Sequence, residues 1–437
     1  MSDAASIVTS NPLIDDRIRG FPAGHAPLPL SEIGTQGWTP HDGSMSLPLI
    51  SLDEAAFAGN IELMMRYVRD HGVEIAPHAK TPMSPSLAGR LVEAGAWGIT
   101  VADIRQASVM LKAGFRKLIL ANEIGGAAAA RRLARLTEAY PDAELNIFVD
   151  SPELVQALGD AWSPTPGLPV LGLLVELGAA RGGLRSNEEA LALVDAILGR
   201  ETANFRLAGV AAYEGAAATP DPEETTRRIS GLTERTARLL EEVRKRVGPD
   251  RPLIATVGGS IYFDMVVRTL KPVVDADPHA VLVLRSGAIF FHDHGIYERG
   301  LSALDRRAGF EIGGKTVSAS EGFKPALRLW AEVLTRPEPG LAVCGMGMRD
   351  VASDQGLPIP LARYRDGVGT PFSGTAKVTA LNDQHAFVSV GAEDDIRVGD
   401  VIEFGISHPC TCLDRHAILY GLNDRNAVVG AYLTSFG

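Results

Sequence analysis

Short apolar segments alternate with longer amphipathic segments along the middle of the chain, and this alternation constrains the fold more than any other feature of the sequence. The eight apolar segments end at Lys80, Asp103, Asn122, Asp150, Gly178, Gly215, Ser260 and Gly287. Helical periodicity marks the stretches between them, for example residues 84–95, 104–114, 127–140 and 223–248. Several of these stretches end at a glycine, which is common just beyond the C-terminus of a helix.

Near-continuous apolar strands joined by crossover helices predict a parallel sheet that is buried on both faces. Eight such units favour a closed (β/α)8 barrel over an open, doubly wound sheet. The eighth unit is the weakest, because residues 279–287 are followed by an aromatic and histidine run rather than by an obvious helix. We therefore predict an α/β fold built on a TIM-like barrel.

The composition and periodicity of the sequence change at both ends of this region. The first 44 residues are rich in proline and glycine and show little periodicity. From residue 325 onward, short β-rich segments are separated by glycine, proline, asparagine and aspartate, which is typical of an all-β domain. We expect an N-terminal arm over residues 1–44 that packs with the β domain, a barrel over residues 45–324, and the β domain over residues 325–437.

Composition narrows the classes of partner and compartment. The chain of 437 residues has 42 Lys and Arg against 53 Asp and Glu, a formal net charge of −11, so bulk charge does not attract nucleic acid or an anionic membrane. Three cysteines do not make a disulfide framework. No apolar run is long enough to span a bilayer, and the N-terminus has no apolar core of a signal peptide. We expect a cytoplasmic protein.

Lys80 is the first candidate for chemistry. It stands in Pro77-His78-Ala79-Lys80-Thr81, where the first barrel strand ends, and reactive groups of such barrels lie at the C-terminal ends of strands. Desolvation there lowers the pKa of a lysine, and a neutral amine can form a Schiff base with an aldehyde. A surface lysine at a strand–loop junction is the alternative.

Later strand ends carry groups suited to an anion or a planar ligand. Gly258, Gly259 and Ser260 end the seventh strand and Gly287 ends the eighth, where backbone N–H groups commonly bind a phosphate. Arg181, flanked by glycines, suits an anion or a phenolate. Tyr213 either lies beside a planar ligand or simply lines the barrel.

The β domain contains His408-Pro409-Cys410-Thr411-Cys412. Alternating positions of an extended strand point to one side, so we expect His408, Cys410 and Cys412 to share a face. Imidazole with thiolate is a donor set that zinc prefers, and two sure ligands describe an open site. Buried cysteines beside a chance histidine remain the alternative. His292 and His294, just after the eighth strand, could also face the barrel mouth.

Taken together and in order, these motifs resemble the fold-type III pyridoxal-phosphate enzymes of the D-serine dehydratase and D-threonine aldolase group, which are relatives of alanine racemase. The resemblance runs from about residue 45 to the C-terminus. Its anchors are Pro77 to Thr81, Glu176 to Gly183, Ala212 to Gly215, Val257 to Ser260, Arg285 to Gly287 and His408 to Cys410.

The resemblance implies a role for each anchor. Lys80 holds pyridoxal 5'-phosphate covalently, Arg181 contacts the phenolic oxygen of its ring, and Tyr213 lies near the pyridine nitrogen. His408 and Cys410 hold a divalent metal near the β-hydroxyl of the substrate, with zinc favoured and manganese as the alternative. A homodimer is also implied. The phosphate group is cradled by Gly258, Gly259, Ser260 and Gly287.

The sequence departs from the family pattern at several positions. Ala216 replaces a histidine that often follows the glycine of the Tyr213 motif, and Ser286 replaces a common proline. Cys412 and Asp414 are additional possible ligands. These differences bear on the substrate rather than on the cofactor.

The resemblance implies a lyase for small D-β-hydroxy amino acids. Because Cys410 stands where the dehydratases have cysteine and the aldolases tend to have a carboxylate, we expect D-serine dehydratase-like β-elimination to a 2-oxo acid and ammonia. Retro-aldol cleavage by a D-threonine aldolase, with His292 or His294 as the base, is the nearest alternative. An amino-acid racemase and a non-catalytic cofactor-binding protein are further alternatives.

Overall fold

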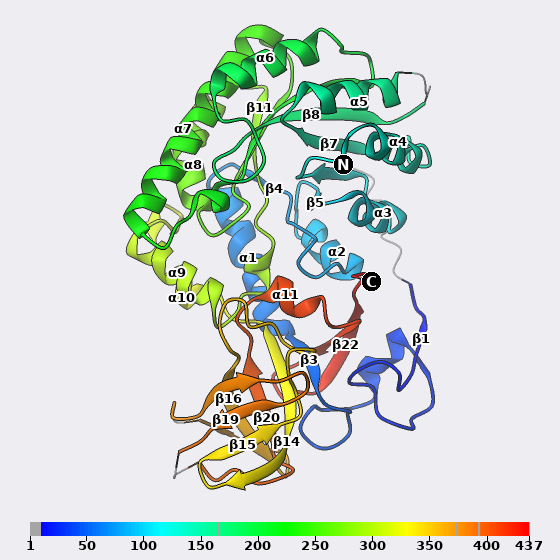
Figure 1. Ribbon diagram of the computed structural model, residues 1–437, viewed down its shortest axis with the longest axis vertical. Helices are drawn as coiled ribbons and strands as arrows, with labels where there is room; N and C mark the ends of the chain where they lie inside the picture. Colours follow the sequence, from blue (N-terminus) through cyan, green and yellow to red (C-terminus); the bar gives the residue numbers. More distant parts are fainter. Residues whose placement is uncertain (1–9, 164–166, 373, 392–393, 437) are drawn as a thin grey trace.

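The computed structural model describes residues 10–163, 167–372, 374–391 and 394–436, which form a barrel and a β domain joined side by side (Figure 1). The barrel sheet has eight parallel strands in the order β4-β11-β10-β9-β8-β7-β6-β5. A parallel bridge between His78 and Thr100 joins the two ends of this order, so the sheet curls back on itself. The predicted TIM-like barrel is confirmed. Its strands are β4 (Glu74–Ile75), β5 (Ile99–Val101), β6 (Lys117–Leu120), β7 (Glu144–Val149), β8 (Val170–Leu177), β9 (Phe205–Ala212), β10 (Leu253–Thr256) and β11 (Ala280–Leu284).

Helices cover the outside of the barrel, and local signals set where they begin. Asp103 and Asp221 accept hydrogen bonds from the first backbone N–H groups of α3 and α7, and Ser186 and Glu189 form a capping box at α6. The helices are α1 (Glu54–Asp70), α2 (Pro85–Glu93), α3 (Ile104–Lys112), α4 (Gly126–Thr137), α5 (Pro152–Trp162), α6 (Asn187–Leu198), α7 (Pro222–Val247), α8 (Phe263–Asp275), α9 (Ile296–Arg306) and α10 (Ala319–Gly322).

The eighth barrel strand, β11, is not followed directly by a long helix. The short helix η3 (Ala288–Phe290) follows β11, and α9 starts only after the histidine run. Another short helix, η2 (Glu214–Ala217), follows β9 at the same end of the barrel. These two turns and the first turn of α8 surround the carboxyl ends of β9, β10 and β11.

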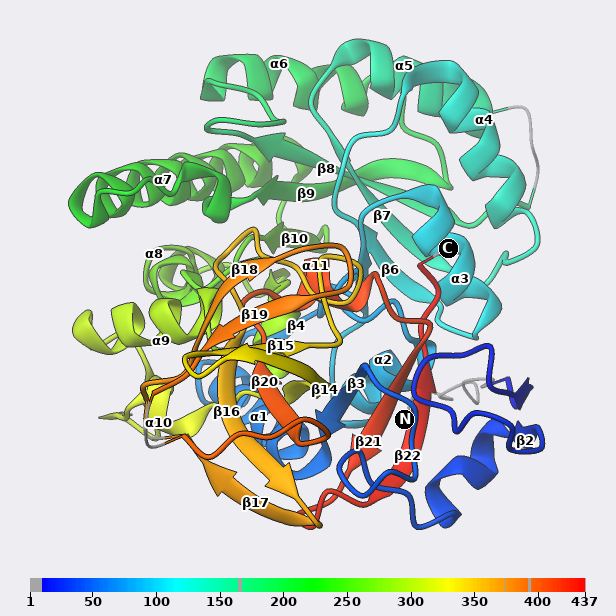
Figure 2. The same cartoon turned by 60° about the horizontal axis from the view of Figure 1, so that its bottom comes forward.

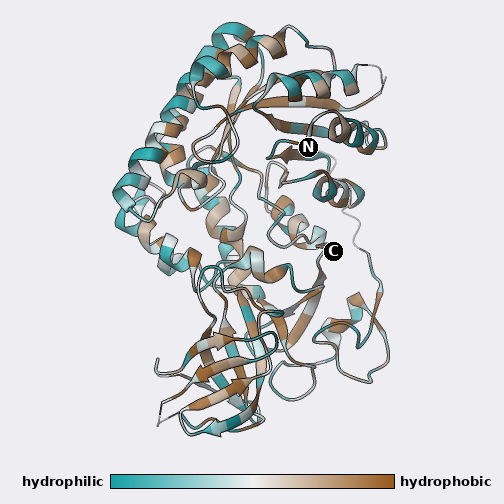
Figure 3. Ribbon diagram, in the orientation of Figure 1, coloured by the Kyte–Doolittle hydropathy of each residue, from teal (hydrophilic) through white to brown (hydrophobic). Residues whose placement is uncertain are grey.

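The inside of the barrel is filled by side chains. Ile119, Phe148, Leu174, Ile254 and Val283 are all at least nine-tenths buried and pack against one another. Such packing makes the barrel a solid core rather than a channel. Polar chemistry is therefore confined to the ends of the strands, and Figure 3 shows the brown strands enclosed by helices whose outer sides are teal.

In the residues that the structure describes, the sheet of the β domain has ten strands, one of which comes from before the barrel. β3 (Leu49–Asp53) pairs antiparallel with β14 and parallel with β21, and α1 begins at the next residue. The chain therefore passes from the β sheet into the barrel at Glu54 and returns to the sheet at Leu327. The other strands are β14 (Leu327–Glu338), β15 (Leu341–Cys344), β16 (Ile359–Arg365), β17 (Val368–Pro371), β18 (Lys377–Leu381), β19 (Ala386–Ser389), β20 (Val401–Gly405), β21 (Ile418–Leu422) and β22 (Val428–Leu433).

The N-terminal arm lies on the β domain. Phe21 and Trp38 are buried in one cluster with Trp330 and Tyr420 of the sheet, and the Tyr420 hydroxyl donates to the carbonyl oxygen of Arg19 at 2.9 Å. The arm's own elements are β1 (Leu13–Ile14), β2 (Leu28–Pro29) and η1 (Leu30–Thr35). A small hairpin of β12 (Glu311–Ile312) and β13 (Lys315–Thr316) lies between α9 and α10.

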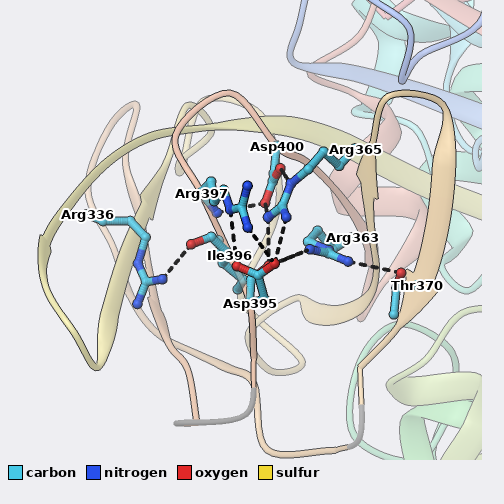
Figure 4. A network of polar contacts seen from close by, with 8 residues as sticks. All are labelled: Arg336, Arg363, Arg365, Thr370, Asp395, Ile396, Arg397 and Asp400. Carbon is cyan, nitrogen blue, oxygen red and sulfur yellow. Dashed lines mark hydrogen bonds and ion pairs between the residues drawn. The ribbon is translucent and has the colours of Figure 1, made fainter.

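A network of arginines and aspartates ties the β19–β20 connection to β16 (Figure 4). Arg365 contacts Asp400 through two nitrogens at 2.7 and 2.8 Å and Asp395 at 2.7 Å. Arg363 and Arg397 also form ion pairs with Asp395. Because Asp400 is buried, its bidentate pairing satisfies a carboxylate that would otherwise be costly to hold there.

Within the described part of the chain, no helix is both long and apolar enough to cross a bilayer.

Candidate active site

Lys80 follows β4 and reaches into a cavity at the carboxyl end of the barrel. The cavity encloses about 480 Å³ of empty space, its open mouth included. Lys80 is exposed at the mouth of the cavity, but the protein around it partly desolvates the amine and lowers its pKa; the positive charges of Arg181 and Arg285 act in the same direction, whereas Cys410 opposes them. A lowered pKa favours the neutral amine that Schiff-base chemistry needs. The cavity is lined by His78, Lys80, Ala102, Ala121, Asn122, Phe148, Arg181, Tyr213, Gly259 and Arg285.

Arg181 and Tyr213 form one wall of this cavity. The Cζ atom of Arg181 lies 4.8 Å from the centre of the Tyr213 ring, within the range of a cation–π contact. Arg181 extends from the glycine-rich turn after β8, and Tyr213 follows β9. The structure therefore brings both sequence-predicted residues to the lysine.

Arg285 also lines the cavity, although no role was predicted for it from the sequence beyond its place in a motif. Its side chain is fully buried, donates to the Thr256 hydroxyl at 2.8 Å and to the Ala212 carbonyl oxygen at 2.9 Å, and lies over the Phe148 ring. Burial lowers the pKa of Arg285 from its usual value, though it stays a cation. The signal for it was an arginine directly after a barrel strand, two residues before Gly287.

The turn after β10 forms a nest of backbone N–H groups that already holds an anion. The buried carboxylate of Glu214 accepts hydrogen bonds from the backbone of Gly258 at 3.0 Å, Gly259 at 3.2 Å and Ser260 at 3.0 Å. It also accepts from the Ser260 hydroxyl at 2.6 Å. Three of the four predicted phosphate donors, all but Gly287, are thus together and suited to an anion, and a phosphate that used these three would have to displace Glu214.

Gly287 permits a close approach between two strand ends. A Cβ atom added there would lie 2.5 Å from the carbonyl oxygen of His78, so only glycine fits without a shift of the backbone. His78 is half-buried, and its Nδ1 atom is buried without a hydrogen-bond partner. Burial, followed by the charges of Lys80 and Arg285, holds the pKa of His78 well below its usual value. A neutral imidazole therefore lies next to Lys80.

A pair of carboxyl groups lies beside Arg181. A Cβ atom on Gly182 would be 2.9 Å from Oε2 of Glu123 and 3.2 Å from Oε2 of Glu176, so both carboxyl groups flank this glycine. Burial, and then contact with Glu123, raises the pKa of Glu176 to about 9. Glu176 therefore keeps its proton at neutral pH. Sequence reasoning missed the pair, because the two residues lie in different turns.

Cys410 lies on a short helix rather than on a strand, and His408 is the residue just before that helix. The expectation of an extended strand is wrong, because α11 (Pro409–Leu413) begins with a proline, whose backbone angle suits a first helical turn. Figure 2 shows α11 lying over the strand ends of the barrel. The Sγ atom of Cys410 is 3.2 Å from the Oγ1 atom of Thr81, so the β domain touches the barrel next to Lys80.

His408 is held by a carboxylate from another loop. Its Nδ1 atom lies 2.6 Å from Oδ2 of Asp354, and the Oδ1 atom of Asp354 accepts from the Thr411 hydroxyl at 2.8 Å. Burial alone would lower the pKa of His408, but contact with Cys410 and Asp354 outweighs it and raises the pKa to about 9.

The chemistry of this pair fits an open metal site. Among the described residues, no group of three or more His, Cys, Asp or Glu side chains is arranged to hold a metal ion. An imidazole and a thiol in contact nevertheless form the beginning of a zinc-type donor set, and further positions would be left to water or substrate.

The other sequence candidates lie elsewhere. Cys412 is fully buried with its Sγ atom 3.9 Å from the Asp350 carbonyl oxygen, and burial raises the pKa of its thiol to about 12. Asp414 pairs with Arg415 at 2.8 Å. Neither His292 nor His294 lines the Lys80 cavity, and burial lowers their pKa values to about 4 and about 3.

Two protein families match the sequence, one for each domain. Residues 52–256 match the family described as "Alanine racemase, N-terminal domain", and residues 326–422 match the "Putative serine dehydratase domain". Together the two matches span most of the chain.

Individual relatives point the same way. The chain is 24% identical over 344 residues to a D-threonine aldolase of Arthrobacter sp, covering 78% of this chain and 80% of that protein. It is 23% identical over 290 residues to the D-threo-3-hydroxyaspartate dehydratase of Delftia sp. (strain HT23), covering 61% of this chain and 74% of that protein. The crystal structure of the D-threonine aldolase from Filomicrobium marinum superposes with a TM-score of 0.70 at 22% identity, over 90% of this chain and 95% of that one.

A barrel with a lysine at its first strand end, joined to a β domain, defines an alanine racemase-like enzyme. The chain belongs to the fold-type III family of pyridoxal-phosphate enzymes, and the aldolases and dehydratase that it matches are lyases. The resemblance inferred from the motifs is therefore confirmed, as is the expectation of an enzyme of this family's lyase group.

Proposed function

We propose that this protein is a pyridoxal-phosphate-dependent, metal-assisted lyase that acts on D-β-hydroxy amino acids and carries out β-elimination to a 2-oxo acid and ammonia. The observation that carries the proposal is the contact between the two domains. It puts the thiol of Cys410 against Thr81, the residue after Lys80, and close enough to influence the charge of Lys80, so a lysine suited to the cofactor and a metal-type pair are neighbours. Both groups are needed if a proton leaves Cα and a hydroxyl leaves Cβ.

Lys80 would hold the cofactor and move the proton at Cα. When bound, pyridoxal phosphate supplies an aldehyde and an electron-accepting ring that stabilises negative charge at Cα. The lowered pKa of Lys80 supports its use as a base near neutral pH, because an amine must be unprotonated to accept a proton. Neutral His78 next to it adds no further positive charge.

The surrounding residues would orient the cofactor. Arg181, beside the Tyr213 ring, suits the phenolic oxygen, and Tyr213 supplies a flat wall toward the pyridine nitrogen. Gly258, Gly259, Ser260 and Gly287 would receive the phosphate, and the anion-binding character of the nest after β10 supports this assignment. Arg285 is rigidly held at the same end of the barrel and adds positive charge there.

His408 and Cys410 would hold the metal, with zinc favoured and manganese as the alternative. A divalent metal acts as a Lewis acid toward an oxygen that leaves as hydroxide, which is otherwise a poor leaving group. Cys410 lies next to Thr81, the residue after Lys80. This position supports a metal site close to Lys80, where the β-carbon of a bound substrate would lie. For D-serine, loss of water and its later return in hydrolysis give pyruvate and ammonia.

Retro-aldol cleavage is the second candidate, since the D-threonine aldolase of Arthrobacter sp is among the relatives. It would need a base at the β-hydroxyl. His292 is buried, His294 is half-buried, and neither lines the cavity, so both are poor candidates for that base. Elimination needs only a proton acceptor at Cα and a Lewis acid at Cβ, and the residues that would supply them, Lys80 and the His408–Cys410 pair, are neighbours.

Product analysis separates the two reactions. Purified protein loaded with pyridoxal phosphate is incubated with D-serine, D-threonine and D-3-hydroxyaspartate, with and without exhaustive chelation. We expect 2-oxo acid and ammonia, lost on chelation and restored by zinc or manganese. Glycine with an aldehyde would establish the aldolase instead, inversion of serine without loss of water would establish a racemase, and turnover that survives chelation would remove the metal from the proposal.

The assembly and compartment follow the same family expectation. We propose a cytoplasmic homodimer that takes small D-amino acids and binds neither nucleic acid nor membrane. The net charge of −11 supports the last two points.

A further inference from the structure

We infer that Asp354 is a positioning residue that sets the tautomer and direction of His408 for metal binding. The inference rests on the proposed metal site and adds a residue to it. Asp354 belongs to the connection between β15 and β16, more than fifty residues before the histidine in sequence.

The hydrogen bond determines which nitrogen can bind a metal. Oδ2 of Asp354 lies 2.6 Å from Nδ1 of His408, which is the distance of a strong, charge-assisted hydrogen bond. The carboxylate can only accept, so Nδ1 carries a proton, and Nε2 is the nitrogen that can bind a metal once its own proton has left. Histidines that ligate a metal commonly have such a partner on the other nitrogen, because it fixes the ring and raises the basicity of the ligating atom.

Both oxygens of Asp354 are already engaged. While Oδ2 contacts the imidazole, Oδ1 accepts from the Thr411 hydroxyl at 2.8 Å. The carboxylate therefore spans His408 just before α11 and a residue within it, and holds the imidazole relative to the helix that carries Cys410. Direct ligation by Asp354 would break these bonds, which favours a positioning role over a third ligand.

The other side chains near α11 that could hydrogen-bond to His408 have different partners. Cys412, on the same short helix, points into the core toward Asp350, and Asp414 is paired with Arg415. Among the described residues, Asp354 is the side chain that forms the hydrogen bond with Nδ1 of His408.

The test is the metal affinity of the full-length protein, measured by titration with Zn²⁺ against a competing chelator and by the charge-transfer absorbance that a Cys410 thiolate gives with Co²⁺. We expect Asp354→Ala to weaken binding by roughly 10- to 100-fold, since supporting partners of ligating histidines have effects of that size. Asp354→Asn, whose amide oxygen can still accept from Nδ1, should recover part of the loss.

Two matched variants separate positioning from general effects. Asp414→Ala removes an exposed negative charge just beyond α11, and Thr411→Val removes the other contact of Asp354. Both should stay within about threefold of the wild-type affinity, because the carboxylate–imidazole bond is intact in each. Melting temperatures of all variants are measured alongside.

Each outcome decides the question. An affinity of Asp354→Ala within threefold of wild type overturns the inference, and so does an equal loss in Thr411→Val, which would mean that anchoring of α11 is what matters. If the wild type binds no metal, or if His408→Ala and Cys410→Ser bind it unchanged, the metal site of the proposed function is wrong and the inference falls with it. Failure of Asp354→Ala alone leaves the proposed function intact.

Discussion

The Sγ atom of Cys410 lies 3.2 Å from the Oγ1 atom of Thr81, the residue that directly follows Lys80. One contact therefore joins α11 of the β domain to the end of the first barrel strand. Since α11 also carries the His408–Asp354 pair at its start, the two domains must be docked for both halves of the site to meet. Changes on either side of this contact should affect chemistry more than folding.

Lys80→Ala should abolish the visible absorbance of the bound cofactor and lower activity by at least about three orders of magnitude, because both the covalent attachment and the base at Cα are lost. The measurement is the absorbance spectrum, together with borohydride reduction and peptide mapping of the wild type. Lys112→Ala, which changes a lysine in the last turn of α3, is the control. A label on a peptide other than the one with Lys80, or turnover in Lys80→Ala, would contradict the assignment.

The two cysteines of α11 should behave in opposite ways. Cys410→Ser should reduce metal affinity and activity by at least about tenfold and leave the free energy of unfolding within about 0.5 kcal/mol, because Cys410 is only partly buried. Cys412→Ser puts a hydroxyl into the core and should cost about 1–3 kcal/mol of unfolding free energy with little effect on metal binding. Urea unfolding and metal titration check both. The reverse pattern would mean that Cys412 is the ligand.

Glu176 should make the stability of the protein depend on pH. Its pKa is raised in the folded state to about 9, mainly by burial, from an ordinary value of about 4.5. The folded protein therefore binds more protons than the unfolded chain between these values, so this contribution to stability is present at low pH and is lost as the pH rises toward 9.

Glu176→Gln should remove that dependence. Between about pH 6 and about pH 8, the wild type should lose up to about 1.4 kcal/mol per pH unit relative to the variant. Urea unfolding of both proteins across this range is the measurement. Parallel pH profiles would mean that the carboxyl pair is already ionised in the folded protein.

Glu214→Gln should destabilise the protein by about 2–4 kcal/mol, because the carboxylate that satisfies three backbone N–H groups and one hydroxyl becomes an amide with a single acceptor oxygen. Glu241→Gln, on the exposed face of α7, should stay within about 0.5 kcal/mol. Thermal and urea unfolding in the absence of cofactor give the comparison. A Glu214→Gln variant as stable as wild type would show that the nest after β10 does not depend on an internal anion.

Much of the fold could be predicted because its signals are local. The four helices expected at residues 84–95, 104–114, 127–140 and 223–248 match α2, α3, α4 and α7 within three residues at each end. Asp221 caps α7 and Gly248 ends it with a positive backbone angle. The eight strand ends were likewise visible, since a buried parallel strand is a run of apolar residues that polar or glycine residues terminate.

The positions of Lys80, Arg181 and Tyr213 in the sequence determine that they meet, because every parallel strand of a barrel presents its carboxyl end at the same rim. Only the tertiary structure decided what surrounds them. Arg285 is a component of the cavity, Glu214 fills the nest after β10, and Asp354 supports His408 from a separate loop, through contacts between residues far apart in the chain.

The same distinction explains the error at α11. Alternation alone described residues 408–412 as extended, but Pro409 and the hydrogen bond from Thr411 to Asp354 favour a helical turn. β3 is a second example, since its partners Leu327 to Trp330 are more than 270 residues away. Hydrophobic periodicity and caps act over a few residues and can be recognised in the sequence, whereas strand pairing, domain docking and raised pKa values depend on which distant groups the folded chain brings within a few ångströms.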